Sequence, residues 1–278
     1  MRLTIPIHEK FDDADAWAAA HRRVGYGAAY CYLNPDIADS VANDYVAAAR
    51  RHDVVIAEVG AWSNPLDTDP VKAAEALEKC RLQLDLAERV GALCCVNIAG
   101  SCSPSKWDGP HADNFLPATF DRIVETVRSV IDAVKPRRTF YTLETMPWIF
   151  PSSPDEYLTL IRAIDRPAFG VHLDPVNMIN CPERAQQSGA FLRECFAKLG
   201  PYIKSCHAKD IVLRDGFMVH LDECRPGTGV LDYATFLREA NKLDPDLPIC
   251  LEHLSDNEYP IAAEHLRSVA AANGLTFR

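Results

Sequence analysis

Short apolar runs alternate with longer amphipathic segments from one end of the chain to the other. Eight of the runs are apolar enough to be buried strands: Leu3–Ile7, Val24–Cys31, Val54–Val59, Leu93–Ile98, Thr139–Thr145, Phe169–Asp174, Ile203–Lys209 and Pro248–His253. Helical spacing of apolar positions is found around residues 12–22, 38–51, 70–90, 117–134, 154–164, 186–199, 231–242 and 258–272. Repeated strand–helix units predict a parallel sheet, because parallel strands need long crossover connections.

Eight such units favour closure of the sheet into a barrel. The chain has 278 residues, close to the roughly 250 residues of an eight-fold β/α barrel. The main alternative is an open, doubly wound sheet, but no Gly-x-Gly-x-x-Gly or phosphate-loop motif follows the first strand. No linker or low-complexity tract divides the chain. We therefore expect an α/β fold, a (β/α)8 TIM barrel, with residues 1–278 in a single domain.

Composition and charge indicate where the protein is located and which partners are disfavoured. No apolar run reaches the ~18 residues needed to span a bilayer, and the first residues carry no apolar signal-peptide segment. We therefore expect a cytoplasmic protein without a membrane partner. The formal charge of −10 disfavours a nucleic-acid partner, because an acidic protein gains no counterion release from phosphates. The ten cysteines include no Cys-x-x-Cys pair and are interpreted as reduced residues of the core.

Four of the later predicted strands end in side chains that can bind a metal ion. These residues are Glu144, Asp174, His207 and Glu252. Burying three carboxylates near one another is costly, and each would raise the proton affinity of the others. A divalent cation removes this conflict. A single acid at a strand end is more often a helix cap or a solvated loop residue, so the prediction depends on all four occurring together.

The composition of this set indicates which ion it would bind. Three carboxylates and one imidazole form a mostly hard, oxygen-rich shell. Such a shell suits Mn²⁺ best, with Mg²⁺ or Co²⁺ as alternatives, whereas a structural Zn²⁺ site favours Cys and His. We therefore predict one divalent metal, with coordination positions left for substrate oxygens.

Three motifs around these residues resemble those of a known superfamily. The segment His207-Ala-Lys-Asp210 precedes Arg225-Pro-Gly-Thr-Gly-Val-Leu-Asp232, and the preceding strand ends in Leu173-Asp-Pro-Val-Asn177. Together with the four metal candidates, they resemble the sugar phosphate isomerase/epimerase superfamily, the xylose isomerase-like TIM barrels. By strand order and spacing the resemblance covers nearly the whole chain, and it is most specific from Glu144 onward.

The resemblance implies proton transfer at a carbon next to a carbonyl group. In such enzymes a metal ion acts as a Lewis acid that stabilises an enediolate. Glu144 and Glu252 would flank the substrate as the acid–base pair, and a small carbohydrate would be the partner. A lyase or dehydratase acting on an inosose or a 3-keto sugar would use the same site and remains an alternative. A non-catalytic sugar-binding barrel is the second alternative.

Five further residues are predicted to bind the substrate. Lys209 follows His207 by two positions, so strand alternation places it on the same side, where it would pair with an oxyanion or form a salt bridge at the rim. Arg225 resembles a substrate contact of the family. Asn177 stands where several relatives have His. Glu58 is expected to bind sugar hydroxyls, and Trp62 to form an apolar wall.

Two histidines and one rival activity are set aside. His172 is expected to be a hydrogen-bonded residue deep in the barrel, and alternation points His253 away from the pocket. Endonuclease IV shares the fold but needs three metal ions and more His ligands. This chain has Asn97 and Asn177 where that enzyme has His. We therefore expect a one-metal carbohydrate site without a nucleic-acid partner, and the resemblance leaves room for a homo-oligomer.

Overall fold

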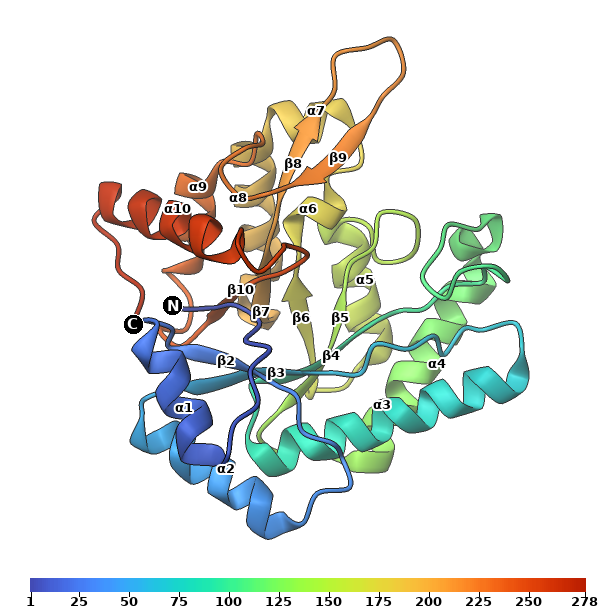
Figure 1. Ribbon diagram of the computed structural model, residues 1–278. Helices are drawn as coiled ribbons and strands as arrows, with labels where there is room; N and C mark the ends of the chain where they lie inside the picture. Colours follow the sequence, from blue (N-terminus) through green and yellow to red (C-terminus); the bar gives the residue numbers. More distant parts are fainter.

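The computed structural model describes residues 1–278, and its centre is a sheet of eight parallel strands (Figure 1). The strands are β1 (Arg2–Thr4), β2 (Ala28–Cys31), β3 (Val55–Gly60), β4 (Cys94–Ile98), β5 (Phe140–Glu144), β6 (Phe169–Leu173), β7 (Ile203–Ala208) and β10 (Pro248–Leu251). Each lies within or beside one of the eight predicted runs. The hydrogen-bonded order is β1-β10-β7-β6-β5-β4-β3-β2. The predicted (β/α)8 TIM barrel is confirmed as a nearly closed barrel.

Closure is completed by contacts between β1 and β2, the two ends of this hydrogen-bonded order. The guanidinium of Arg2 crosses the gap, because its Nη1 donates to the carbonyl of Gly27 at 3.2 Å, just before β2. The same side chain forms ion pairs with Asp53 at 2.7 Å and Asp246 at 2.8 Å. One buried cation therefore ties together the chain segments before β2, β3 and β10.

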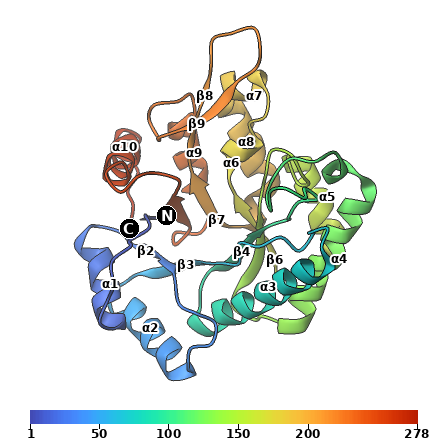
Figure 2. The same ribbon diagram turned by 45° about the vertical axis from the view of Figure 1, so that its right-hand side comes forward.

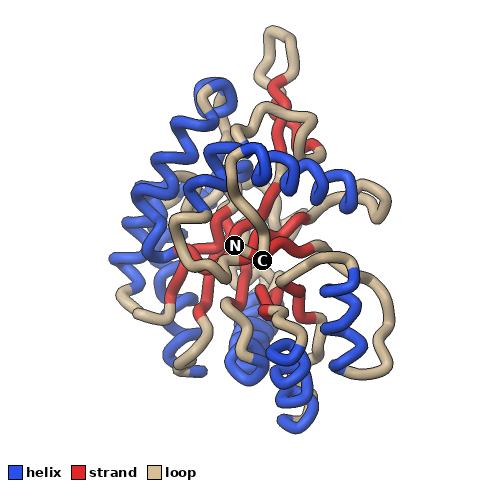
Figure 3. Tube along the Cα trace, turned by 90° about the vertical axis from the view of Figure 1, so that its left-hand side faces the viewer, coloured by secondary structure: helices blue, strands red, loops and turns tan.

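Helices surround the strands on the outside, as Figures 2 and 3 show. The main ones are α1 (Ala14–Arg23), α2 (Asp39–Arg51), α3 (Pro70–Val90), α4 (Pro117–Val134), α5 (Pro154–Ile164), α8 (Ser188–Leu199), α9 (Tyr233–Ala240) and α10 (Tyr259–Ala272). All eight correspond to predicted helices. The largest fully buried side chains include Tyr141, Tyr157 and Phe236. No helix is both long enough and apolar enough to cross a bilayer.

Local sequence signals account for several helix boundaries. The Asp69 carboxylate accepts from the amide of Val71 at 2.9 Å, and Pro70 occupies the first helical position of α3. The observed start agrees with the helix predicted around residues 70–90. The side-chain oxygen satisfies a free amide, and the proline supplies a helical φ. The same helix ends at Gly91, whose φ of 67° lies in the left-handed region. Glycine adopts that conformation without a Cβ clash.

The loop regions contain elements that the sequence analysis does not predict. Strands β8 (Asp210–Leu213) and β9 (Leu221–Cys224) form an antiparallel hairpin after β7, where a long loop is expected. Two short helices, α6 (Pro175–Met178) and α7 (Pro182–Gln186), follow β6. Two 3-10 turns, η1 (Ala112–Phe115) and η2 (Gly200–Tyr202), complete the list. The hairpin projects from the end of the barrel at which β7 terminates (Figure 1).

Seven of the ten cysteines lie in the core as predicted, and Cys31, Cys181 and Cys224 are half-buried. All ten are free thiols. Cys94 lies inside the barrel, where its Sγ is 3.1 Å from Ser205 Oγ. Burial is the largest cause that raises the pKa of Cys94, to about 12. These thiols therefore act as small core groups rather than as reactive ones.

Candidate metal centre

Four side chains predicted as metal ligands converge at the carboxyl ends of their strands. Glu144 ends β5, Asp174 directly follows β6, His207 lies in β7, and Glu252 directly follows β10. One ligand atom from each lies within 4.8 Å of those of the others. The strands β5, β6, β7 and β10 are consecutive neighbours in the sheet. Parallel pairing thus brings together residues far apart in sequence, at the end of the barrel where active sites form.

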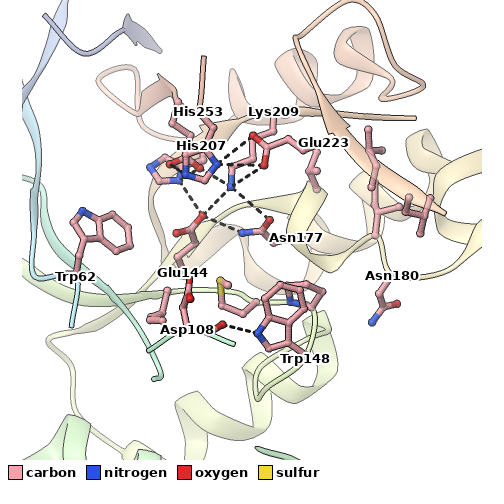
Figure 4. A pocket seen from close by; sticks show the side chains of 18 of the residues that line it. Trp62, Asp108, Glu144, Trp148, Asn177, Asn180, His207, Lys209, Glu223 and His253 are labelled. Carbon is pink, nitrogen blue, oxygen red and sulfur yellow. Dashed lines mark hydrogen bonds and ion pairs between the residues drawn. The ribbon is translucent and has the colours of Figure 1, made fainter. Parts of the chain in front are cut away.

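One ammonium group and one imidazole lie among the three carboxylates. His207 Nδ1 is 2.7 Å from Glu252 Oε1 and 3.0 Å from Glu144 Oε1. The Lys209 ammonium is 2.7 Å from Glu252 Oε1 and 2.9 Å from Asp174 Oδ2. It is 3.5 Å from Glu144 Oε1 (Figure 4). Lys209 is only 3% exposed. Lys209 therefore lies on the same side as His207, as strand alternation predicts.

Burial and mutual charge shift the proton affinities of this cluster strongly. Burial, followed by the charge of Glu252, raises the pKa of Glu144 to about 7. Burial also acts to raise the pKa of Glu252, but His207 and Lys209 outweigh it and hold that pKa well below its usual range. Burial acts to lower the pKa of Lys209, yet the charges of Asp174, Glu144 and Glu252 raise it well above its usual range. Lys209 therefore stays charged.

The oxygen atoms of this cluster fit a divalent cation. Asp174 Oδ2 and Glu252 Oε1 are buried and contact Lys209 as ion pairs, without the geometry of a hydrogen bond. The other oxygen of Asp174 accepts from the amides of Val176 and Asn177, which fixes the carboxylate. Fixed carboxylate oxygens with free acceptor capacity, beside one imidazole nitrogen, are suitable ligands for Mn²⁺ or Mg²⁺.

A second group of side chains lies behind His207, inside the barrel. Glu58 Oε1 is 3.6 Å from His207 Nε2, and Glu58 Oε2 is 3.5 Å from His172 Nδ1. His172 Nδ1 also lies 2.5 Å from Ser205 Oγ. Burial lowers the pKa of His172 well below its usual range, so its imidazole is neutral. His172 is thus the buried, hydrogen-bonded histidine that the sequence predicts.

Glu58 lines the cavity at this site but faces the two imidazoles. It is 2% exposed. A carboxylate on the far nitrogen of a metal-binding histidine fixes the tautomer and the orientation of the ring. The predicted contact of Glu58 with sugar hydroxyls stays a prediction. The structure places its carboxylate 3.6 Å from His207 Nε2, which is within ion-pair range but beyond hydrogen-bond distance.

Asn177 and Trp62 both lie beside the predicted ligands. Asn177 Nδ2 donates to Glu144 Oε1 at 3.1 Å and to the carbonyl of Thr145 at 3.0 Å. The Trp62 ring centroid is 6.3 Å from that of His207. Both residues line the cavity, and their contacts with a substrate stay predictions.

Arg225 lies apart from the centre. It follows β9, donates to the carbonyl of Pro226 at 3.3 Å and is absent from the cavity lining. The hairpin, which the sequence analysis does not predict, inserts two strands between Lys209 and Arg225 and carries Arg225 to its base. The predicted substrate contact of Arg225 therefore gains no support from the geometry.

The expectation that His253 points away from the pocket is wrong. His253 lines the cavity, with Nε2 3.6 Å from Glu252 Oε2 and Nδ1 3.2 Å from Glu223 Oε1. Strand β10 ends at Leu251, and His253 has a φ of 56°. The alternation of side-chain directions holds only within a strand. It does not apply to His253, which lies beyond the strand end in a left-handed conformation. The hydrogen bond with Glu223 raises the pKa of His253.

Asp210 explains the Pro-Gly-Thr-Gly motif. Its buried carboxylate accepts from the amides of Gly227 at 2.9 Å, Gly229 at 3.0 Å and Leu231 at 3.0 Å. A Cβ on Gly229 would lie 2.3 Å from Asp210 Oδ1. Only glycine allows this close approach of the backbone. The paired motifs around Asp210 and Gly229 therefore hold the loop that follows the hairpin against the end of β7.

The cavity above the centre has a volume of about 890 Å³. It reaches from the loops after β1 and β2 to those after β4, β5 and β6, and one side is formed by the hairpin. Trp62 and Trp148 lie on different sides of the Glu144 side chain (Figure 4). Trp62 is predicted from the sequence, whereas Trp148 and Trp107, which also line the cavity, are not.

Solved structures with the same architecture cover nearly the whole chain. Endonuclease IV from Thermus thermophilus superposes with a TM-score of 0.74 at 14% identity, over 98% of this chain and 100% of that one. D-psicose 3-epimerase from Clostridium cellulolyticum, solved with D-tagatose, gives 0.64 at 14% identity over 98% and 96%. The E. coli 3-keto-D-glucoside 4-epimerase gives 0.67 at 11% identity over 98% and 99%. At these identities the likeness establishes the fold.

Sequence comparison establishes the family. Among curated proteins none matches the chain. The family described as "Xylose isomerase-like TIM barrel" matches residues 18–271, which include all four predicted metal ligands. The superfamily resemblance is thereby confirmed, and the chain belongs to the xylose isomerase-like TIM barrel family.

Proposed function

We propose that this protein is a divalent-metal-dependent isomerase or epimerase acting on a keto sugar or a related polyol. The observation that carries this proposal is the placement of Glu144 and Glu252. Their carboxylates contact the same nitrogen, His207 Nδ1, from two strands of the barrel. They are thereby able to flank a substrate bound in front of the imidazole.

Each residue then has a distinct task. Asp174 and His207 act as ligands only, whereas Glu144 and Glu252 also move protons: one removes the proton next to the carbonyl group and the other returns it. A bound Mn²⁺, Mg²⁺ or Co²⁺ would supply Lewis-acid stabilisation of the enediolate. Positioned acid–base groups contribute about 100- to 10,000-fold to the rate.

The remaining polar groups support this pair. Lys209 stays charged and is placed to donate to the negative oxygen that forms when the α-proton leaves. Asn177 holds Glu144 by a hydrogen bond and so fixes the direction of its free oxygen. Trp62 offers an apolar face to the carbon–hydrogen side of a sugar ring. We propose a small carbohydrate as the partner, and neither nucleic acid nor a membrane.

Elimination is a second candidate reaction, and one observation favours it. His253 and Glu223 form a hydrogen-bonded pair at the cavity wall, beside Glu252. An imidazolium at this position would be able to protonate a leaving group on the carbon beyond the α-carbon. With such a group on the substrate, the same enediolate would expel it instead of being reprotonated.

The test is hydrogen exchange of keto sugars in deuterated water by the Mn²⁺-loaded protein. We expect deuterium at the carbon next to the carbonyl group, followed by a new isomer, epimer or eliminated product. Glu144→Gln and Glu252→Gln are expected to bind metal and lose exchange. Near-wild-type turnover in either metal-loaded variant would overturn the acid–base assignment. A protein that binds no divalent metal and exchanges no proton would support the sugar-binding barrel instead.

A further inference from the structure

The cavity is larger than one sugar ring requires. Its volume of about 890 Å³ lies near the upper end of the roughly 300–1,000 Å³ range found for sites of drug-sized ligands. The metal centre, Lys209 and Trp62 occupy only part of its lining. The rest of the lining comes from residues of the surrounding loops that are not among the four predicted metal ligands. We therefore expect a second part of the ligand, beyond the sugar ring, to fill the additional space.

One side of this space is apolar and aromatic, and we call it the tryptophan arm. It is formed by Trp107 from the loop after β4, Met146 and Trp148 from the loop after β5, Ile179 after α6, and Val219 from the hairpin. Trp148 lies on the opposite side of Glu144 from Trp62 (Figure 4). The tryptophan arm is continuous with the metal centre within one cavity.

The tryptophan arm is held in place by specific contacts. Trp148 Nε1 donates to the carbonyl of Asp108 at 2.7 Å, which joins the loop after β5 to the loop after β4. Asp108 Oδ1 is also 3.2 Å from the ammonium of Lys106. Trp107, in contrast, is 43% exposed. An anchored indole beside an uncovered one offers apolar area that a ligand would remove from water.

The opposite wall of the cavity has a different chemistry. His8, Tyr30, Tyr32 and Tyr259 lie there, near Glu252 and His253. Tyr32 is 61% exposed, and its ring is 6.3 Å from that of His8. These rings carry hydroxyl or imidazole groups that bind water or polar ligand atoms well. An apolar ring is therefore better accommodated by the tryptophan arm than by this wall.

We propose that the substrate is a glycoside whose keto-sugar ring lies at the metal centre and whose aglycone, an aromatic ring, lies in the tryptophan arm. This inference rests on the proposed function and adds the class of substrate. The anomeric carbon of a glycoside is an acetal and carries no carbonyl group. The reacting carbonyl must therefore lie at another carbon of the ring, so that the substrate is a keto-pyranoside rather than a free ketose.

The test compares two probes that differ only in the aglycone. Binding of the methyl and phenyl β-glycosides of 3-keto-D-glucose to the Mn²⁺-loaded protein is measured by titration calorimetry. We expect the phenyl glycoside to bind at least about tenfold more tightly. Trp107→Ala and Trp148→Ala should bring the ratio of the two dissociation constants close to one, while the methyl glycoside binds as before. Trp148→Phe should keep part of the preference.

Tyr32→Ala is the matched control, because it removes an exposed aromatic ring from the opposite wall of the same cavity. It should leave the ratio unchanged. The tryptophan arm is excluded as the aglycone site if Tyr32→Ala abolishes the preference while Trp107→Ala does not. Equal binding of the two probes to the wild-type protein overturns the substrate class. Trp107 is exposed, so its variant remains informative if Trp148→Ala fails to fold.

The proposed function fails in a different way. If the phenyl glycoside binds more tightly but neither probe undergoes metal-dependent proton exchange, the isomerase proposal is overturned and the aglycone site stands. If both probes exchange equally well and bind equally, the reaction stands and the aglycone site is overturned. If neither probe binds, the substrate class is overturned, and the hydrogen exchange of free keto sugars decides the isomerase proposal separately.

Discussion

Two buried cations lie at opposite ends of the barrel and have very different surroundings. Arg2, at the start of β1, donates to the carbonyl of Gly27 and pairs with the carboxylates of Asp53 and Asp246. Those carboxylates are 63% and 39% exposed. Lys209, beyond the end of β7, lies among carboxylates that are nearly all buried and partly without hydrogen bonds.

The difference separates stability from chemistry within one fold. At the Arg2 end each donor has a partner, and the acidic partners are still hydrated, so the cost of burying charge is small. At the Lys209 end three carboxylates share one ammonium group and one imidazole and retain free acceptor capacity. A protein tolerates such a buried, incompletely bonded cluster where it has a function. In barrels of this type the amino-terminal end serves stability and the carboxyl-terminal end serves activity.

The largest expected effect comes from neutralising one carboxylate at the Lys209 end. Glu144→Gln should lower turnover about 100- to 10,000-fold, because the acid–base pair is broken. The metal-free protein should be at least as stable as the wild type, since burial next to Glu252 raises the pKa of Glu144 and penalises its charge. Thermal unfolding together with proton-exchange rates checks both parts. A clear loss of stability would contradict the comparison.

Removal of the Arg2 cation at the other end should lower stability and leave turnover unchanged. Arg2→Ala is expected to lower the free energy of unfolding by about 2 to 3 kcal/mol, the scale of hydrogen bonds to charged groups. Turnover of the folded enzyme should not change. Urea denaturation measures the stability, and Arg51→Ala is the control, because it removes an exposed ion pair with Asp15 and should have little effect. Reduced metal affinity in Arg2→Ala would show that the two ends are coupled.

Glu58 tests how far the carboxyl-terminal cluster extends into the barrel. Glu58→Gln should weaken Mn²⁺ binding about 10- to 100-fold, because the partner of His207 Nε2 loses its charge. Calorimetric titration with Mn²⁺ provides the dissociation constant. Trp62→Phe, a change at the cavity face of His207, is the control and should bind Mn²⁺ like the wild type. Unchanged affinity in Glu58→Gln would leave only the predicted contact with sugar hydroxyls.

The smallest expected effect comes from a solvent-exposed helix cap, Asp69. Asp69→Ala should cost about 1 kcal/mol, because the amide of Val71 at the start of α3 loses its acceptor. Asp69→Asn should recover most of that loss. Thermal denaturation of the two variants provides the measurement. A loss as large as that of Arg2→Ala would imply that α3 contributes to closure of the barrel.

Regular periodicity explains why so much of the fold is predictable. All eight strands and eight main helices follow from apolar runs and amphipathic segments, because each strand is buried on both faces. The hairpin of β8 and β9 is not predicted, because it lacks this periodicity. Its strands have four residues each. In β9, Asp222 and Glu223 are exposed and leave no apolar run, and the short apolar run Ile211–Leu213 of β8 follows β7 too closely to stand out as a separate strand.

The residues of the site also fall into two groups, those that the sequence predicts and those that it does not. Glu144, Asp174, His207 and Lys209 are predictable because strand ends of a parallel barrel must converge. His253 is misplaced because its left-handed backbone is not encoded by a glycine or asparagine signal. Trp107 and Trp148 lie in long loops, where spacing along the chain says nothing about distance. Arg225 depends on the hairpin, whose path only the folded structure shows.

The missing ladder between β1 and β2 has a consequence for how the molecule opens. Backbone amides at this seam should exchange with solvent earlier than those of the inner strands, since local opening starts where few hydrogen bonds must break. The strands that carry the four metal ligands are contiguous, β10-β7-β6-β5, and none of them borders the seam. The barrel is therefore able to fluctuate at its closure while the half that carries the chemistry remains assembled.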